Sequence, residues 1–285
     1  MDSRRRDVLR GVAAGALATA VPAILASRVS FAAPAAGDAR FVFVLLRGAL
    51  DGLAAVPPVG DPHYHKLRSE LALDNAPGLA RLDDLFSLHP ALRFMAEQWR
   101  EKHLSVIHAV ATPHRERSHF DAQDVLESGF TLPHASQSGW LNRALAGLPD
   151  SKSRQAGVAL GAGIPLVMRG ANDVASWSPS QQPELEQDTL QRLADLYADD
   201  ALLSRRLADA LIADDMAGNM EGGMSGPANG RGVGVQLAQT AATAAGFLKQ
   251  QNGPRVAVFE TTGWDTHANQ GAESGALALR LAALD

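Results

Sequence analysis

Short, uninterrupted runs of apolar residues, separated by segments with helical spacing, constrain the fold of this chain more than any other feature. Two of these runs are residues 40–46 (RFVFVLL) and residues 255–260 (RVAVFE). A run without polar alternation is typical of a strand that is buried on both faces of a sheet. Further short strands are predicted at 104–110, 155–160 and 165–168.

Helical patterns fill the intervals between these runs. Helices are predicted at 90–102, 118–129, 189–213, 235–251 and 277–285. Ser118 followed by Asp121 resembles the capping box that begins a helix. Strands that alternate with helices predict an α/β fold with a mostly parallel sheet flanked by helices. The Gly- and Met-rich stretch 214–232 is interpreted as a flexible insertion within this domain.

The first 33 residues are predicted to be a twin-arginine export signal. Arg5 and Arg6 precede a spacer and an uncharged, Ala-rich stretch over 11–27, and residues 30–32 offer a small-x-small cleavage site. The alternative is a membrane anchor, but the uncharged stretch has 17 residues, whereas a spanning helix needs roughly 20. The signal predicts the twin-arginine translocase as a partner during export, and a periplasmic or secreted location.

Charge and cysteine content exclude several classes of partner and of chemical site for the exported chain. Removing residues 1–33 lowers Lys+Arg from 26 to 21 and Asp+Glu from 31 to 29, so the net charge moves from -5 to -8. An acidic chain with few aromatic residues argues against nucleic acid as a partner. The absence of cysteine rules out disulfides, thiolate metal ligands and a cysteine-derived catalytic residue.

Three segments that follow predicted strands carry the candidate chemistry. They are Asp51, the segment 114–124, and Asp265 with His267. Because the carboxyl ends of parallel strands lie at one edge of a sheet, these segments are expected to meet there. Carboxylate oxygens and imidazole nitrogens suit zinc, manganese or related divalent ions.

Each candidate also has a structural interpretation. Asp51 is suited to turn formation, and His119 and Asp121 are suited to capping a helix and ordering the surface. Asp265 and His267 would form a loop turn with a hydrogen-bonded histidine. The remaining histidines are interpreted as structural residues of loops and helix ends: His63, His65, His89, His103 and His134.

A basic loop precedes the helix predicted at 118–129. His114, Arg115 and Arg117 form either a solvated charged loop or an anion-binding clamp. The clamp is plausible chemically because a guanidinium group binds phosphate or sulfate through two parallel hydrogen bonds.

With these residues assembled, the chain resembles a bacterial family of twin-arginine-exported, sulfatase-like proteins of unknown function. That family lies in the alkaline phosphatase/sulfatase superfamily. The resemblance covers residues 41–285. Its most specific motifs are LRGALDGL at 46–53, RSHFDAQD at 117–124, GWLNR at 139–143 and GWDTHANQ at 263–270.

The resemblance implies an alkaline phosphatase-like domain over 34–285 that holds two divalent ions, such as zinc, manganese, calcium or magnesium, in a full-length homologue. The implied metal ligands are Asp51, Asp265 and His267. The implied catalytic residues are Ser118 as the nucleophile, with Thr112 as an alternative, together with His119 and Asp121. One ion would lower the pKa of the attacking hydroxyl, while the other neutralises charge on the leaving oxygen.

Family members typically continue to an Asp-His-Gly element that supplies further ligands, whereas this sequence stops at Asp285. Part of the metal site and of the sheet is therefore expected to be missing. The leading prediction is a metal-dependent hydrolase of small anionic phosphoesters or sulfoesters. The alternative is a non-catalytic periplasmic or surface protein that keeps the hydrolase fold and binds an exported partner. A role in carbohydrate processing is a third prediction.

Overall fold

The computed structural model describes residues 39–148, 156–178, 193–194, 196–218 and 233–285. All of them belong to one compact unit, Asp38–Asp285. The predicted export signal at 1–33 lies outside the described residues, as do residues 219–232 of the predicted insertion.

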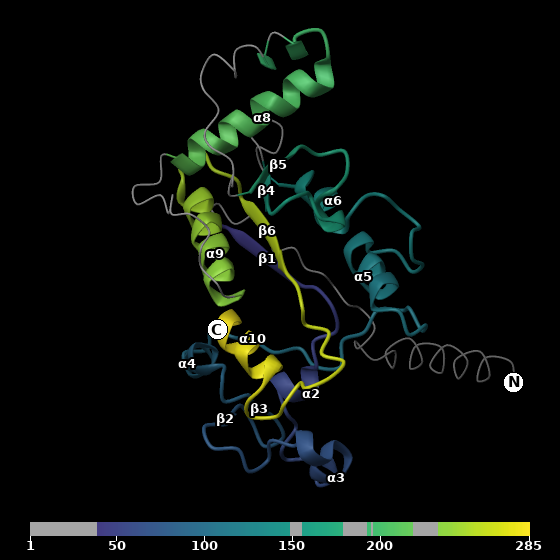
Figure 1. Cartoon of the computed structure of the whole chain (residues 1–285), viewed down its shortest axis with the longest axis vertical. Helices are drawn as coiled ribbons and strands as arrows, with labels where there is room; N and C mark the ends of the chain where they lie inside the picture. The colour runs from purple at the N-terminus through teal and green to yellow at the C-terminus, as the bar shows by residue number, and fades with distance from the viewer. Residues whose placement is uncertain (1–38, 149–155, 179–192, 195, 219–232) are drawn as a thin grey trace, which may run out of the picture. The chain divides into compact units, whose positions relative to one another are not determined.

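A four-stranded, fully parallel sheet organises this unit (Figure 1). Its strands, in spatial order, are β1 (Phe41–Leu46), β6 (Val256–Thr261), β4 (Gly157–Leu160) and β5 (Val174–Trp177). Phe41 and Gly157 both pair with Val256, so β1, β6 and β4 begin level with one another. The prediction of an α/β fold with a mostly parallel sheet is confirmed.

Helices surround the sheet and continue beyond its carboxyl edge. They are α2 (Gly52–Ala55), α3 (Tyr64–Arg68), α4 (Arg93–Arg100), α5 (His119–Ser128), α6 (Trp140–Leu145), α8 (Ala201–Gly218), α9 (Val233–Lys249) and α10 (Ala276–Leu284). Two 3-10 helices, η1 (Ser69–Leu71) and η2 (Leu166–Met168), and the antiparallel pair β2 (Ala80–Arg81) and β3 (Ser87–Leu88) complete the described elements.

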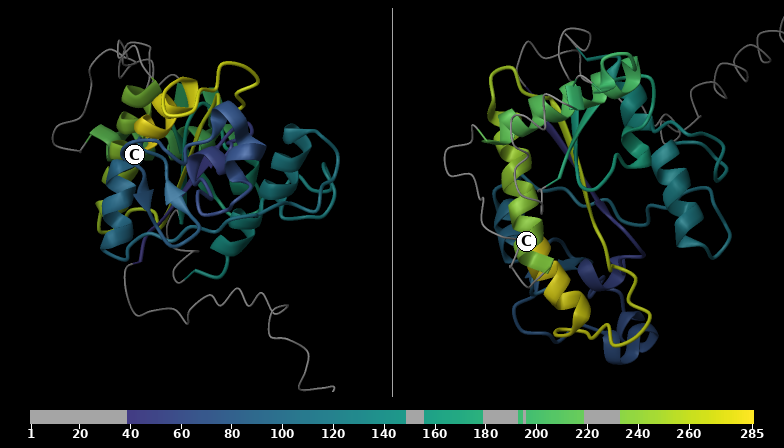
Figure 2. Two further views of the ribbon diagram at one scale, coloured as in Figure 1. Left: turned by 90° about the horizontal axis from the view of Figure 1, so that it is seen from below. Right: turned by 45° about the horizontal axis from the view of Figure 1, so that its top comes forward.

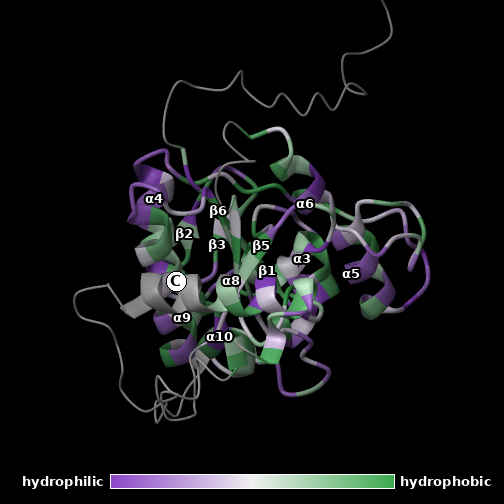
Figure 3. Ribbon diagram, turned by 90° about the horizontal axis from the view of Figure 1, so that it is seen from above, coloured by the Kyte–Doolittle hydropathy of each residue, from purple (hydrophilic) through white to green (hydrophobic). Residues whose placement is uncertain are grey.

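Side chains of β6 alternate between two hydrophobic clusters, one on each face of the sheet. Val256 and Val258 pack with α6 and η2 on one face. Ala257 and Phe259 pack with α9 on the other. Figure 2 shows α9 and α6 on opposite sides of the strands. In Figure 3 the central strands are largely hydrophobic, whereas α5 carries hydrophilic residues. The burial of β6 on both faces confirms what its continuous apolar run predicts.

A third hydrophobic cluster lies beyond the carboxyl ends of β1 and β6. Trp264 is 1% exposed and packs there with Leu277 and Leu281 of α10, and with buried residues of α2 and α4. This cluster fixes the loop that follows β6, because Trp264 is part of that loop.

The predicted strand at 104–110 is wrong. These residues adopt no regular secondary structure, and Ile107 and Val110 are largely exposed. An apolar run forms a strand only where a neighbouring strand completes its hydrogen bonds, and His108 is held elsewhere. Its Nε2 lies 2.9 Å from the carbonyl oxygen of Val56, and its ring stacks on Phe86.

Two further predictions near the sheet also need correction, and one strand was missed. Residues 165–168 form η2 rather than a strand, because the amide of Met168 donates to the carbonyl of Pro165 and closes a tight turn. Strand β5 was not predicted, since Ser176 marks the start of a polar segment. The run at 40–46 is a strand, but as an edge strand it leaves Phe41 and Val42 exposed rather than buried.

Most of the predicted helices are confirmed, but the one at 189–213 is not continuous. Residues 198–200 are not helical, α8 begins only at Ala201, and residues 189–192 lie outside the described residues. Helix α5 begins after Ser118 and ends at Gly129, and α9 and α10 match their predicted ranges closely. Helix α8 extends to Gly218, so residues 214–218 of the predicted insertion are helical. Within the part of the chain that the structure describes, no helix combines the length and apolarity required to cross a bilayer.

Candidate functional site at the carboxyl edge of the sheet

The loops that follow β1 and β6 meet at the carboxyl edge. Gly48 adopts a φ of 120°, and a Cβ atom at this position would lie 2.6 Å from the backbone nitrogen of Asp265. The amide of Trp264 also donates to the carbonyl of Arg47 at 3.3 Å. Gln123 of α5 joins them, since its Nε2 donates to the carbonyl of Gly48 at 3.1 Å. The three predicted segments therefore do converge.

Asp265 lies at the centre of this convergence. Its Oδ2 is 2.6 Å from Nε2 of His267 and 3.8 Å from Nδ1 of His119, at the start of α5. Asp265 and His119 are mostly buried, whereas His267 is 83% exposed and so has room to rotate toward a ligand. Gly263 belongs to this loop and adopts a φ of 84°. Its backbone lies directly against the guanidinium of Arg280, and this close approach fixes the position of the loop.

The carboxylate of Asp51 is fully engaged by groups of the chain itself. Its Oδ1 accepts the amides of Leu53 and Ala54 at 3.1 and 3.3 Å, which caps α2. Its Oδ2 accepts from Arg68 and, at 2.8 Å, from Nε2 of Gln270. A carboxylate offers about four lone-pair positions, and all four are occupied.

Burial raises the pKa of the Asp51 carboxyl, but two hydrogen bonds oppose it. The bonds from Gln270 and Arg68, with the positive charge of Arg68, outweigh burial and hold this pKa below its ordinary value of 3.8. Asp51 is therefore ionised at neutral pH, and Arg68 already supplies its counter-charge. Arg68 gave no signal in the sequence; Gln270 stands in the GWDTHANQ motif but was not singled out there.

Ser118, His119 and Asp121 lie at the start of α5, where both interpretations of them remain compatible with their contacts. The Oγ of Ser118 accepts the amide of Asp121 at 3.2 Å and caps the helix. The carboxylate of Asp121 contacts a different histidine, since it lies 3.3 Å from Nε2 of His134. Only His119 of the three contacts Asp265.

The basic loop is less closely tied to Asp265. Arg115 and Arg117 are exposed, and Arg115 donates to the carbonyl of Thr112 at 3.3 Å. The Nε2 atom of His114 is buried and has no hydrogen-bond partner among the described residues. This loop leads directly into Ser118, which places its positive charge next to the beginning of α5.

An ion-pair network holds α5 against the end of β1. Arg47 pairs with the buried carboxylate of Glu127 and, at 2.7 Å, with Glu260. Burial lowers the pKa of Arg47, but these two carboxylates raise it further than burial lowers it. The Oε2 of Glu127 also accepts the amide of Val167 at 3.1 Å, which ties α5 to η2. Glu127 thus positions His119 indirectly, through α5.

The GWLNR motif at 139–143 is structural. Asn142 is fully buried, and its Nδ2 donates to the carbonyls of Met168 and Asn172 at 2.8 Å each. Its Oδ1 accepts the amide of Asn172 at 3.1 Å. Arg143 donates to the carbonyl of Ser128 at 2.7 Å and so joins α6 to the end of α5. The motif therefore fixes α5 and the β4–β5 connection.

The donor set fits a divalent ion at only part of the predicted site. Within the described ranges, no three His, Asp or Glu side chains are already grouped as a metal site. Asp265 and His267 offer adjacent oxygen and nitrogen donors, and His119 approaches the same carboxylate. Asp51 does not fit, because Arg68 occupies the place of a cation. Zinc and manganese accept such mixed ligands.

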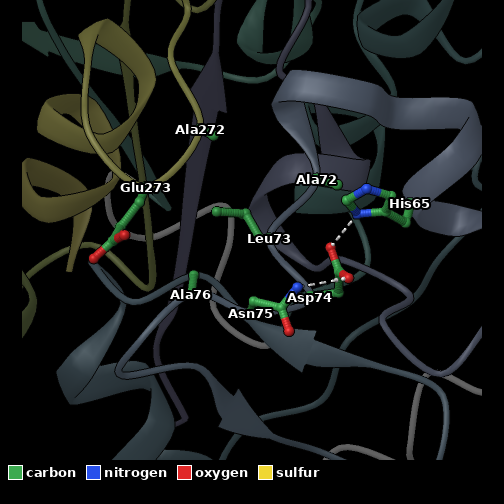
Figure 4. A pocket seen from close by; sticks show the side chains of 8 residues that line it. All are labelled: His65, Ala72, Leu73, Asp74, Asn75, Ala76, Ala272 and Glu273. Atoms are coloured by element: carbon green, nitrogen blue, oxygen red, sulfur yellow. Dashed lines mark hydrogen bonds and ion pairs between the residues drawn. The ribbon is translucent and has the colours of Figure 1, made fainter.

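A separate depression of about 250 Å³ lies between the segment after α3 and the loop before α10. Figure 4 shows His65 pointing toward Asp74, at 3.0 Å, and Glu273 on the opposite side. The hydrogen bond from His65 lowers the pKa of Asp74. His65 therefore has the structural contact that the sequence predicts, as does the buried His89, whose Nε2 lies 3.0 Å from the carbonyl oxygen of Ala272.

Comparisons with protein-family models, with curated proteins and with solved structures find no match for this chain. Its function is therefore inferred from its own residues and from their arrangement at the carboxyl edge.

Proposed function

We propose that this protein is an exported, metal-dependent hydrolase of small phosphoesters or sulfoesters, with its reaction centre at the carboxyl edge. The observation that carries this proposal is the approach of His267 and His119 to one carboxylate, that of Asp265. The three side chains come from two segments that lie far apart in the sequence. Ligands of α/β sheets bind at this edge.

In this proposal Asp265 and His267 hold a divalent ion, with His119 as the third donor. Such an ion, when bound, neutralises charge on the ester and lowers the pKa of a coordinated hydroxyl. Ser118 is the proposed nucleophile, because it adjoins His119 and its Oγ only accepts in its helix cap, so its own proton remains available. Its oxygen would lose its proton to water and bond to phosphorus or sulfur, while the ester oxygen leaves and takes up a proton from water. A second water would then attack, release the acid and restore the Ser118 hydroxyl.

The basic residues His114, Arg115 and Arg117 are proposed to bind the anionic group of the substrate. Guanidinium groups suit phosphate and sulfate because both present oxygens at matching spacing. Their position just before Ser118 supports this role. Asp121 contacts His134, and we propose that it orders the first turn of α5.

Metal content and turnover test this function together. Purified protein is analysed for zinc, manganese, calcium and magnesium, and then assayed with p-nitrophenyl phosphate and p-nitrophenyl sulfate. Asp265→Ala and His267→Ala are expected to lower turnover by more than about 100-fold, because even outer-shell partners of a metal cost about 10–100-fold. His103→Ala is the control, since the side chain of this exposed histidine pairs with Glu101 and not with Asp265. Unchanged metal content and turnover in both site variants would sink the assignment.

The alternative is a non-catalytic exported protein that binds a partner through the same fold. The full engagement of Asp51 by Arg68 and Gln270 favours it, because a predicted metal ligand has become structural. A partner recovered in a stable complex by pull-down, from protein that contains no metal and turns over neither ester, would decide for this alternative.

A further inference from the structure

Asp51 has a different role in this chain from the one that its position after β1 predicts. Its two oxygens accept four hydrogen bonds, from two amides of α2, from Arg68 and from Gln270. Arg68 also neutralises its charge. A metal ion at Asp51 would have to displace a guanidinium group that forms a mostly buried ion pair, and such pairs are costly to break.

The bond from Gln270 connects Asp51 to the loop that carries the candidate ligands. Nε2 of Gln270 donates to Asp51, while its Oε1 accepts from the hydroxyl of Thr266 at 2.6 Å. Thr266 lies between Asp265 and His267 in the sequence. One amide group therefore ties the residue between the two candidate ligands to the end of β1.

The main chain of Gln270 is also fixed. Its carbonyl accepts the amide of Leu277 at 3.1 Å, at the start of α10. Leu277 is fully buried in the third hydrophobic cluster. Gln270 thus stands between a rigid helix and the anchored carboxylate, and it closes the loop that begins at Trp264.

We propose that Asp51, Arg68 and Gln270 form an anchor that positions Asp265 and His267, and that Asp51 is not a metal ligand. The part of this proposal that concerns metal affinity rests on the proposed function. The part that concerns the loop does not, because it holds for the metal-free protein. Arg68 keeps the carboxylate of Asp51 ionised, and Gln270 links this carboxylate to Thr266 through two hydrogen bonds.

The two roles of Asp51 predict opposite effects for a change of Gln270. If Asp51 were a ligand, Gln270→Leu would remove one of the two bonds to its Oδ2, so metal affinity would be unchanged or increased. If Asp51 is an anchor, the same change loosens the loop and lowers the affinity. Loss of an orienting outer-shell bond typically costs about 10–100-fold in metal affinity. Gln270→Glu would act in the same direction, because it places a second carboxylate against Asp51.

Two measurements on the full chain test the proposal. Hydrogen–deuterium exchange of the metal-free protein follows the amides of residues 262–271, and calorimetric titration with Mn²⁺ and Zn²⁺ gives the affinity. Gln270→Leu is expected to speed exchange in that segment about fivefold, as the loss of a hydrogen bond of about 1 kcal/mol predicts. Mn²⁺ and Zn²⁺ are expected to bind about 10–100-fold more weakly. Thr266→Val, which replaces the hydroxyl with a methyl group of similar size, is the second variant, should Gln270→Leu fail to fold.

Gln98→Leu is the matched control, because Gln98 is partly exposed, lies in α4 away from this loop, and its side-chain amide donates to Glu101. Exchange in 262–271 that equals that of the control overturns the anchor. Faster exchange together with unchanged or tighter metal binding would show that Asp51 is a ligand, and this result also overturns the anchor. A wild-type protein that binds neither ion overturns the proposed function instead, and the exchange rates alone then decide whether the anchor exists.

Discussion

The guanidinium of Arg47, at the end of β1, pairs with the carboxylate of Glu127 inside α5, and the Glu127 side chain is only 3% exposed. The pair joins the first strand to the helix that carries His119. Glu127 has a second partner in the amide of Val167, so it connects three elements at once. Arg47 remains paired with Glu260 on its other side.

Glu127→Ala is expected to destabilise the protein by about 2–4 kcal/mol. The change leaves the buried amide of Val167 without a partner and removes one counter-charge of Arg47. Urea unfolding measures the difference in the free energy of unfolding. Glu260→Gln is the control, since Glu260 is more exposed and such pairs contribute about 0–1 kcal/mol. Equal losses in the two variants would contradict the role of Glu127.

Asn142→Ala is expected to destabilise the fold by about 2–4 kcal/mol, because each buried polar group left unsatisfied costs about 1–3 kcal/mol. The variant leaves the carbonyls of Met168 and Asn172 without the donor that they share. Thermal unfolding of this variant and of Asn75→Ala provides the comparison, as Asn75 is exposed and its side-chain amide donates to the neighbouring Asp74. A transition temperature as high as that of the control would show that the hydrogen bonds of Asn142 are not required for stability.

The lowered pKa of the Asp51 carboxyl predicts that the free energy of unfolding depends on pH. Because its pKa is below 3.8 in the folded protein, ionised Asp51 stabilises the fold above about pH 4, and this contribution is lost as the pH falls further. Wild-type protein should therefore exceed Asp51→Asn in the free energy of unfolding by a constant amount between pH 5 and 7. The difference should shrink toward pH 3, as measured by urea titration. A difference that does not change with pH would argue against the Arg68–Asp51 pair.

Asp285 caps α4 from outside that helix. Its Oδ2 accepts the amide of Phe94 at 2.8 Å and its Oδ1 accepts the amide of Met95 at 2.9 Å, while Leu92 supplies no side-chain cap. Asp285→Ala should cost about 1 kcal/mol, as helix caps usually do. Asp285→Asn should cost less, because one acceptor oxygen remains. If urea titration gives the same free energy of unfolding for both variants and wild type, the cap contributes nothing.

Export by the twin-arginine pathway predicts that the protein is no longer exported when the arginine pair is replaced. The double variant Arg5→Lys with Arg6→Lys is expected to remain inside the cell, because the pathway reads the arginine pair itself and not merely its charge. Arg4→Lys retains the pair and should be exported like the wild type. Immunoblots of periplasmic and cytoplasmic fractions measure the distribution. An equal periplasmic share in the two variants would exclude this pathway.

Local patterns account for the elements whose signals are complete within a few residues. The run at 255–260 is buried on both faces as β6, and Ser118 with Gly129 bounds α5 as predicted. The order of apolar runs and helices was enough to indicate a parallel sheet. It also indicated that Asp51, His119 and Asp265 would approach one another, since parallel strands end at one edge.

Predictions that depended on a distant partner were less successful. Residues 104–110 have the composition of a strand, but His108 is held by Val56 and Phe86 instead. Strand β5 contains the polar residue Ser176, so a search for apolar runs misses this strand. The strand forms because β4 pairs with it along its whole length. A strand requires its neighbour's hydrogen bonds, and sequence spacing does not show whether that neighbour exists.

The sequence by itself determined the class of the fold, the edge at which its polar loops meet, and the pairing of Asp265 with His267 two residues away. Only the tertiary structure decided what each carboxylate does there. Asp51 and Asp265 follow strands in the same manner, yet Arg68 and Gln270 saturate the first, while the second faces His267 and His119. The physical reason is that the charge and free lone pairs of a carboxylate depend on groups brought to it from distant parts of the chain.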